Sequence, residues 1–192
     1  MFKIIKKHYN YLNLSNTFKN GHWNSKHQQL LRYNELLKYT TNNNTIIDYG
    51  CGYGDICTSI DKDKYLGIDI NDFMIKNNLV KYPDYSFLLI NDIKQVPNNY
   101  DWIICSGVFT VHTSDNLFYN IIDNLLDKCN IGISFNLFES NNIYKLPKDE
   151  NDDSIKYRGF DINKIYKKYN CEVINRNYQS EKNIYIKKNG LN

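Results

Sequence analysis

Two patterns of apolar residues alternate along most of this 192-residue chain. Short, nearly continuous apolar runs are typical of strands buried on both faces, and apolar positions three and four residues apart are typical of amphipathic helices. After a polar stretch at 40–45, the two patterns follow one another repeatedly. The predicted strands are 45–50, 65–70, 85–92, 100–107 and 130–138, and the predicted helices are 55–62, 71–82, 114–129 and 161–170.

This alternation predicts an α/β fold with a doubly wound, mostly parallel seven-stranded sheet and helices on both faces. The last two apolar segments, 171–178 and 181–188, have no helix between them. They predict a terminal hairpin, and with it one antiparallel strand near the C-terminus. Ahead of the sheet, leucines at helical spacing predict a helix with Ser25 as its N-cap, and Asn71 or Asp72 is the predicted N-cap of the helix at 71–82. We expect one domain over 1–192, with an N-terminal helical lid at 1–44 and the α/β core at 45–192.

Composition narrows the class of protein. The 24 basic and 21 acidic residues give a net charge of +3, a balance too even to indicate a nucleic-acid protein by itself, and we expect no nucleic-acid partner. No apolar run is long enough to span a membrane, so we expect a cytoplasmic chain. The five cysteines form no CxxC pair and no Cys/His cluster, which predicts reduced thiols and no metal site. Alanine is absent while Asn, Ile, Lys and Tyr abound, which indicates an AT-rich genome.

The glycine loop after the first predicted strand is the main candidate site. The stretch "DYGCGYGD" holds Gly50, Gly52 and Gly54 between Asp48 and Asp55. Ligands bind at the carboxyl ends of parallel strands, and glycines leave the backbone bare there. The spacing GxGxG differs from the dinucleotide motif GxGxxG, and a carboxylate capping the next helix would repel a pyrophosphate. An ordinary tight turn is the alternative, but the flanking acids favour a cationic ligand.

S-adenosylmethionine fits this pattern, because it carries a sulfonium and an ammonium and no phosphate. Asp69 ends the second predicted strand about 20 residues after the first acid, the spacing at which an acid meets ribose hydroxyls. Asp92 follows the third predicted strand. It is placed to accept a hydrogen bond from the adenine amino group, and a turn or helix cap is the alternative interpretation.

Four segments in order, "DYGCGYGD", "GIDIND", "LINDI" and "YDWIICSGVF", resemble the motifs of class I S-adenosylmethionine-dependent methyltransferases. The resemblance covers 45–109 at the level of motifs, and the alternation of strands and helices extends it to the C-terminus. It implies a Rossmann-like core and methyl transfer from S-adenosylmethionine. The implied roles are the methionine moiety for Asp48, Gly50 and Gly52, the ribose for Asp69, the adenine for Ile70, Asp92 and Ile93, and the methyl group with its acceptor for Ser106 and Gly107.

A second, narrower resemblance concerns the N-terminal segment. "GHWNSKHQQLLRYNELL" and the later "GISFNLFES" are similar to segments of a group of small class I methyltransferases. This similarity implies that the segment folds over the cofactor, with Trp23 beside it and Arg32 or Gln29 at the methionine carboxylate. The alternative is that Trp23 packs against the sheet and Arg32 is a solvated helix residue.

The methyl acceptor is predicted mainly by what the sequence lacks. The fourth strand ends in "CSGVF" and not in the Asn/Asp-Pro-Pro-Tyr that adenine-N6 or glutamine-N5 methylation would require, and no Pro-Cys occurs. We expect a small-molecule or sugar acceptor, methylated on oxygen. His112 follows the fourth strand and is the predicted general base, with a surface histidine as the alternative. An RNA or protein methyltransferase and a non-catalytic partner subunit remain alternative functions.

Overall fold

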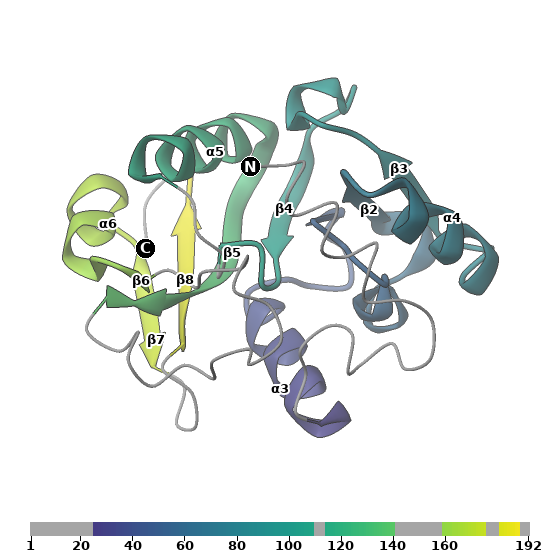
Figure 1. Cartoon of the computed structure of the whole chain (residues 1–192), viewed down its shortest axis with the longest axis horizontal. Coiled ribbons are helices and arrows are strands. Elements are labelled where there is room, and N and C mark those ends of the chain that lie inside the picture. Colours follow the sequence, from purple (N-terminus) through teal and green to yellow (C-terminus); the bar gives the residue numbers. More distant parts are fainter. Residues whose placement is uncertain (1–24, 110–113, 141–158, 176–180, 189–192) are drawn as a thin grey trace, which may run out of the picture.

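A computed structural model of the chain describes residues 25–109, 114–140, 159–175 and 181–188 (Figure 1). Its centre is one sheet with the strand order β3-β2-β1-β4-β5-β8-β7, and the short β6 pairs with β5. The strands are β1 (Ile46–Tyr49), β2 (Tyr65–Asp69), β3 (Ser86–Leu89), β4 (Tyr100–Cys105), β5 (Cys129–Glu139), β6 (Gly159–Phe160), β7 (Glu172–Asn175) and β8 (Glu181–Lys187).

The pairing directions confirm the predicted sheet. Strands β1 to β5 are parallel to one another, and β8 is antiparallel to both β5 and β7. The terminal hairpin therefore supplies the one antiparallel strand near the C-terminus. The sequence did not predict β6, a two-residue strand parallel to the end of β5.

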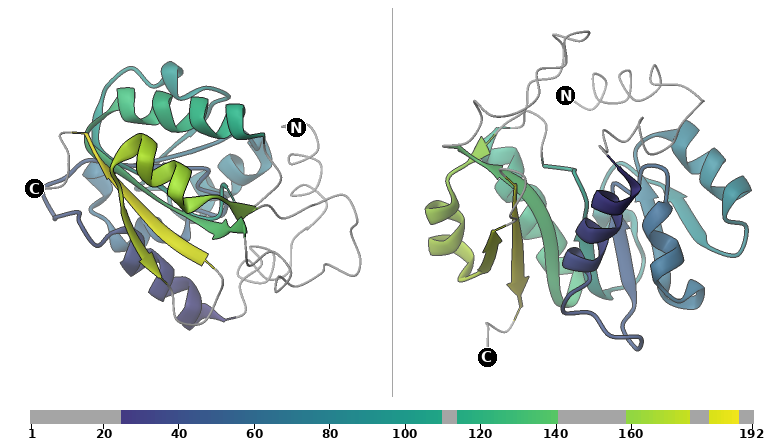
Figure 2. Two further views of the ribbon diagram at one scale, coloured as in Figure 1. Left: turned by 90° about the vertical axis from the view of Figure 1, so that its left-hand side faces the viewer. Right: turned by 90° about the horizontal axis from the view of Figure 1, so that it is seen from below.

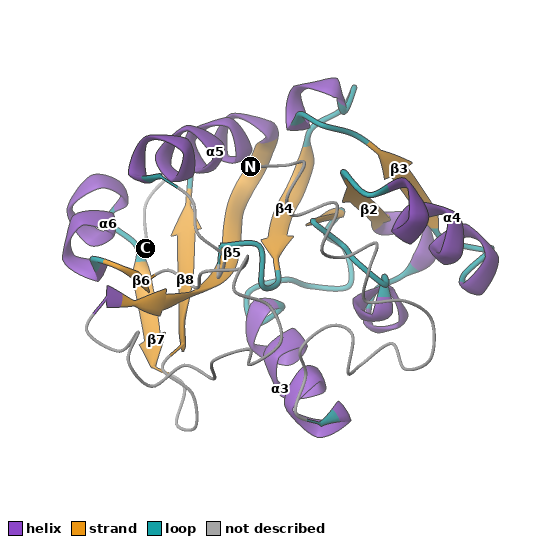
Figure 3. Ribbon diagram, viewed as in Figure 1, coloured by secondary structure: helices purple, strands orange, loops and turns teal. Residues whose placement is uncertain are grey.

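Four α-helices are described, and local sequence explains where they begin (Figure 3). Ser25 accepts a hydrogen bond from the backbone N–H of Gln28, and Asn71 accepts one from Phe73, so both predicted N-caps are confirmed. The segment predicted as a helix at 55–62 forms only a 3₁₀ turn, η1 (Asp55–Ser59). The α-helices are α3 (Lys26–Leu36), α4 (Asp72–Lys81), α5 (Asp115–Lys128) and α6 (Ile162–Tyr169), and further 3₁₀ turns are η2 (Lys62–Lys64) and η3 (Ile93–Gln95).

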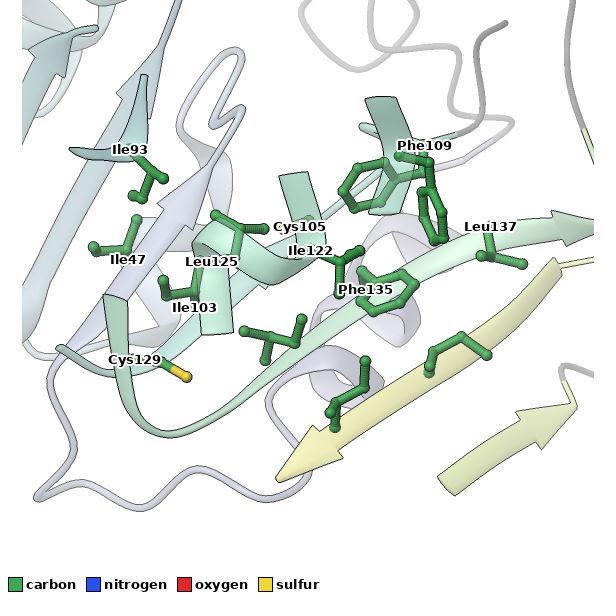
Figure 4. Packing of buried hydrophobic residues seen from close by; sticks show 14 of the residues in the cluster. Ile47, Ile93, Ile103, Cys105, Phe109, Ile122, Leu125, Cys129, Phe135 and Leu137 are labelled. Atoms are coloured by element: carbon green, nitrogen blue, oxygen red, sulfur yellow. The ribbon is translucent and has the colours of Figure 1, made fainter. Parts of the chain in front are cut away.

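The helices cover both faces of the sheet. Helices α5 and α6 lie on one face, and α3 lies on the other (Figure 2). The first face packs a large apolar cluster, in which Phe135 and Leu137 of β5 meet Ile122 and Leu125 of α5 (Figure 4). The second face packs a smaller cluster that joins α3, η1 and α4 to the sheet. No helix in the described parts of the chain is long and apolar enough to cross a membrane.

Helix α3 is tied to the sheet by side chains from two strands. Ser134 Oγ of β5 donates a hydrogen bond to the carbonyl of Leu36 at 2.7 Å, and Tyr185 Oη of β8 donates to the carbonyl of Glu35 at 2.5 Å. The last turn of a helix has carbonyls without intrahelical partners. Ser134 satisfies the carbonyl of Leu36, and that of Glu35 also accepts the backbone N–H of Lys38 at 3.1 Å. The predicted lid at 1–44 falls partly outside the described residues, since only α3 and the connection after it are described, so the lid stays a prediction.

Candidate functional site

The strand order creates a switch point between β1 and β4. From β1 the chain adds β2 and β3 on one side, and it then returns to place β4 and β5 on the other side. The carboxyl ends of β1 and β4 are neighbours, and such a point is where open α/β sheets bind ligands. Two turns follow these ends, the Gly50–Gly54 loop after β1 and Ser106–Gly107 after β4.

All three glycines of the loop have left-handed backbones, with φ of +74° at Gly50, +52° at Gly52 and +71° at Gly54. A Cβ added at Gly54 would lie 2.9 Å from the Phe87 ring, and one at Gly50 would lie 2.6 Å from Val108. A Cβ at Gly52 would meet nothing within 4 Å. Gly54 and Gly50 therefore serve the packing of the loop, and Gly52 presents bare backbone to open space.

Asp69 holds the loop in shape. Its Oδ2 accepts the backbone N–H of Gly52 at 2.9 Å, and its Oδ1 accepts that of Asn71 at 2.8 Å. Burial raises the pKa of the Asp69 carboxyl, and hydrogen bonds from the backbone N–H groups of Gly52, Asn71 and Ile70 oppose that rise. Each carboxylate oxygen has a second lone pair, so Asp69 still has capacity for hydroxyl donors.

Asp48 lies beneath the loop on the face covered by α3. It is 2% exposed, and its Oδ2 accepts a hydrogen bond from Tyr65 Oη at 2.9 Å. Burial raises the pKa of Asp48 to about 7, the Tyr65 hydroxyl lowers it, and the nearby Asp69 raises it further. A cation beside the loop would therefore meet a carboxyl that is ready to ionise near neutral pH.

The expectation that Asp55 caps the helix after the loop is wrong. Gly54 occupies the N-cap position of η1 and makes no side-chain capping bond. The Asp55 carboxylate instead accepts Lys81 Nζ at 2.6 Å, Tyr82 Oη at 2.8 Å and Gln29 Nε2 at 3.2 Å. Burial alone would raise its pKa, but these three donors lower the pKa below the usual value. Asp55 thus joins α3, α4 and the glycine loop.

The residues predicted at the adenine differ in how they are placed. Asp92 is exposed and caps η3, with its Oδ1 accepting the backbone N–H of Lys94 at 3.0 Å. Ile93 is buried in the core beneath the sheet, so only its backbone is available to a ligand. Ile70 is half-buried directly after β2. The cap interpretation of Asp92 is therefore confirmed, and contact with adenine stays a prediction for all three.

The turn after β4 is held by a residue that the sequence analysis did not name. Asn136 of β5 accepts the backbone N–H of Gly107 at 2.7 Å through its Oδ1. Gly107 has a φ of +78°, and a Cβ added there would meet only Arg32 Nη1, at 3.9 Å. Ser106 is half-buried beside it. The turn adjoins the glycine loop, because a Cβ added at Gly50 would contact Val108. Contact of Ser106 and Gly107 with a methyl acceptor stays a prediction.

Arg32 and Gln29 reach the same region from α3. The Arg32 guanidinium pairs with Glu181 of β8 at 2.5 Å, and the two side chains are 11% and 3% exposed. Arg32 is therefore not a solvated helix residue, and its predicted contact with a methionine carboxylate would be additional to this ion pair. Gln29 donates to both Tyr33 and Asp55, so it already has protein partners.

Two predicted site residues, Trp23 and His112, lie outside the described residues. Three others were missed by sequence reasoning: Asn136, Asn183 and Glu181. Each is a polar residue in a strand whose side chains alternate between the two faces of the sheet, a pattern that usually points polar residues toward water. Nothing in the local sequence signals that pairing of β5 with β8 and packing of α3 would bury them.

Comparison with known proteins agrees with this geometry. Residues 40–184 match a family model described as a methyltransferase domain. No curated protein sequence is similar enough to match.

Solved structures of similar fold include a magnesium protoporphyrin IX methyltransferase from Synechocystis PCC 6803 with bound SAH. It has a TM-score of 0.66 and 14% identity over 97% of this chain and 93% of that one. The N-methyltransferase NodS from Bradyrhizobium japonicum WM9 has a TM-score of 0.60 and 12% identity, over 85% of this chain and 97% of that one.

Proposed function

The chain belongs to the methyltransferase-domain family and is an S-adenosylmethionine-dependent methyltransferase, and from this we propose that its acceptor is a small molecule or sugar, methylated on oxygen. The observation that carries the proposal is the enclosure of the switch point by α3. Gln29 bonds α3 to the glycine loop, and Arg32 bonds it to β8. A helix fixed at both ends of the site leaves little access for a macromolecule.

The residues at the loop fit the cofactor. Gly52 offers open backbone, Asp69 offers carboxylate oxygens to the ribose hydroxyls, and Asp48 supplies negative charge near the methionine end. These are the features that a ligand with a sulfonium, an ammonium and a ribose requires. S-adenosylmethionine, when bound, supplies a methyl group already activated by its sulfonium.

The work left to the protein is positioning and exclusion of water. Ser106 and Gly107 would direct the acceptor toward the methyl group in line with the bond that breaks. A hydroxyl acceptor must also lose a proton, and His112 is the residue that we propose as its base. The Synechocystis methyltransferase described above is named for a small molecule, magnesium protoporphyrin IX, which is in line with this class of acceptor.

The test is transfer of label from methyl-labelled S-adenosylmethionine into an extract separated into small molecules, RNA and protein. We expect the label in the small-molecule fraction, bound through an ether or ester oxygen. Gly52→Val is the matched inactive control, because a branched side chain would fill the space that the cofactor needs. Label in RNA or protein, or on nitrogen or carbon, would contradict the proposed acceptor.

A further inference from the structure

Three rows of side chains cross from β5 to β8 on the face covered by α3. Residues opposite each other in this antiparallel pair are Ser134 with Tyr185, Asn136 with Asn183, and Phe138 with Glu181. Opposite side chains on one face lie close enough to act together. In the first row, both hydroxyls donate to carbonyls of α3. In the third row, Glu181 pairs with Arg32 of α3.

The middle row differs, because α3 offers it no partner. Asn136 and Asn183 are both 0% exposed. Among the described residues, Asn136 Nδ2 and both polar atoms of the Asn183 amide have no hydrogen-bond partner. Ser106 Oγ, at the adjoining end of β4, is likewise buried without a partner in the described structure. Buried polar atoms of native proteins are nearly always bonded, so four such atoms together call for a ligand or water.

The orientation of the Asn136 amide is fixed by its neighbour. The Gly107 N–H needs an acceptor, which assigns Oδ1 to that side and leaves Nδ2 facing the other way. Asn183 offers one donor group and one acceptor whichever way its amide is turned. The cluster thus presents two amide donors, one amide acceptor and the Ser106 hydroxyl beside the turn at Gly107.

Among the described residues, one ion pair, Arg32 with Glu181, flanks this cluster. Arg32 and Glu181 neutralise each other at 2.5 Å, and both are largely buried. A carboxylate or an ammonium placed here would find no free opposite charge in that pair, and burial of an unpaired charge is costly. A neutral group that both accepts and donates hydrogen bonds would satisfy the free atoms.

We propose that Asn136, Asn183 and Ser106 form the polar end of the methyl-acceptor pocket and bind a neutral carboxamide or ring-lactam group of the acceptor. The acceptor's carbonyl oxygen takes the two amide donors, and its N–H donates to Asn183 Oδ1. Phe138 lies on the same face in the next row and suits an acceptor that carries a ring. This inference rests on the proposed function, since it names the acceptor chemistry of that same site.

The test uses three probes of one shape and different charge: benzamide, benzoate and benzylamine. Each is added to the full chain, labelled with ¹⁵N and saturated with SAH, and the side-chain amide signals are followed by NMR. We expect benzamide to shift the Asn136 and Asn183 signals, and the two charged probes to leave them unchanged. The proposal would be overturned if benzamide left both amide signals unchanged, or if either charged probe shifted them.

Asn183→Leu keeps the volume and removes both polar atoms. It should weaken benzamide binding at least tenfold, leave SAH affinity unchanged, and leave the melting temperature unchanged or higher, because an unbonded amide is replaced by an apolar group. Asn130→Leu, at an exposed position of the neighbouring strand β5, is the control and should bind benzamide like the parent. Parent-like binding by Asn183→Leu, or a marked fall in its stability, would assign the cluster to a structural water.

SAH affinity of the parent, measured by calorimetry, distinguishes failure of the carboxamide pocket from failure of the proposed function. If the parent binds SAH but benzamide shifts neither amide signal, only the proposal of a carboxamide pocket is wrong. If the parent binds no SAH, the proposed function is wrong as well. If Asn183→Leu does not fold, the titrations of the parent alone decide the question.

Discussion

The two faces of the sheet divide the chemistry of this protein between them. The face under α5 and α6 packs a cluster of buried apolar side chains. The face under α3 and α4 holds the buried polar and charged side chains of the described structure, which are Gln29, Asp48, Asn71, Asn78, Ser134, Asn136, Glu181 and Asn183.

This difference assigns different tasks to the two layers. Apolar burial is the main source of folding free energy, whereas each buried polar group costs free energy unless it is bonded. The α5/α6 face therefore contributes mainly to the free energy of folding and, among the described residues, offers no buried polar groups to a ligand. The α3/α4 face carries Ser134 and Glu181, which bond to α3, and the amides of Asn136 and Asn183, which keep polar atoms without a partner among the described residues. Changes at these two amides should therefore alter binding more than folding.

The largest effect is expected on the apolar face, from Phe118→Ala. Phe118 of α5 is 0% exposed and packs against Phe109, Phe135 and Phe160, with ring centroids 4.3–6.1 Å away. Truncation should cost about 3–5 kcal/mol of unfolding free energy. Denaturant unfolding measures the loss, and SAH affinity of the folded fraction should stay at the parent value. A stable variant with weakened SAH binding would break the division between the faces.

Asp69→Ala should come next, and it should act on both folding and binding. Loss of charge-assisted bonds to the ribose should weaken S-adenosylmethionine about 10- to 150-fold, or about 1.5–3 kcal/mol. Because Asp69 also accepts the N–H groups of Gly52 and Asn71, the variant should lose stability without ligand as well. Asp69→Asn, which keeps a carbonyl acceptor, is the control for the structural part. Calorimetry that gives the parent affinity for Asp69→Ala would place the ribose elsewhere.

The smallest effect concerns pH. The pKa of Asp48 is raised to about 7 in the folded protein, first by burial, so the free protein binds a proton there below neutral pH. A cationic ligand favours the ionised form, and binding at low pH must therefore release that proton. Affinity for S-adenosylmethionine should rise up to about tenfold from pH 5.5 to 7.5, since one pKa unit equals about 1.4 kcal/mol. Asp48→Asn should flatten the profile, and an equally steep profile in this variant would exclude Asp48 as its cause.

The same shift has a consequence for folding. An acid whose pKa is raised in the folded state binds more protons there than in the unfolded chain, between its usual 3.8 and about 7. The contribution of Asp48 to stability is therefore present at acid pH and is lost as the pH rises through 7.

The fold could be predicted because its signals are local. Strand and helix periods, the caps at Ser25 and Asn71, and the glycines after β1 each depend on a few neighbouring residues. Strand β6 was not predicted because two residues are too few to show a hydrophobic period. They form a strand only through pairing with the end of β5.

The unpredicted parts of the candidate site depend on contacts between distant segments. Arg32 and Glu181 are 149 positions apart, and Gly107 and Asn136 are 29 apart. In "SFNLF" the asparagine is indistinguishable from one that faces water, and only the strand order decides otherwise. Asp55 was predicted as a cap from its place after a glycine, but Lys81 and Tyr82, at the C-terminal end of α4, bond to its carboxylate instead.

Helix α3 has a further consequence for the dynamics of the protein. A helix of 11 residues is marginal in water by itself, so its order depends on tertiary bonds. Four of these bonds, through Gln29, Arg32, Glu35 and Leu36, reach the glycine loop, β8 and β5. Such a segment opens as a local unit at lower free energy than the central strands. Its amide protons should therefore exchange with solvent before those of β1 and β4.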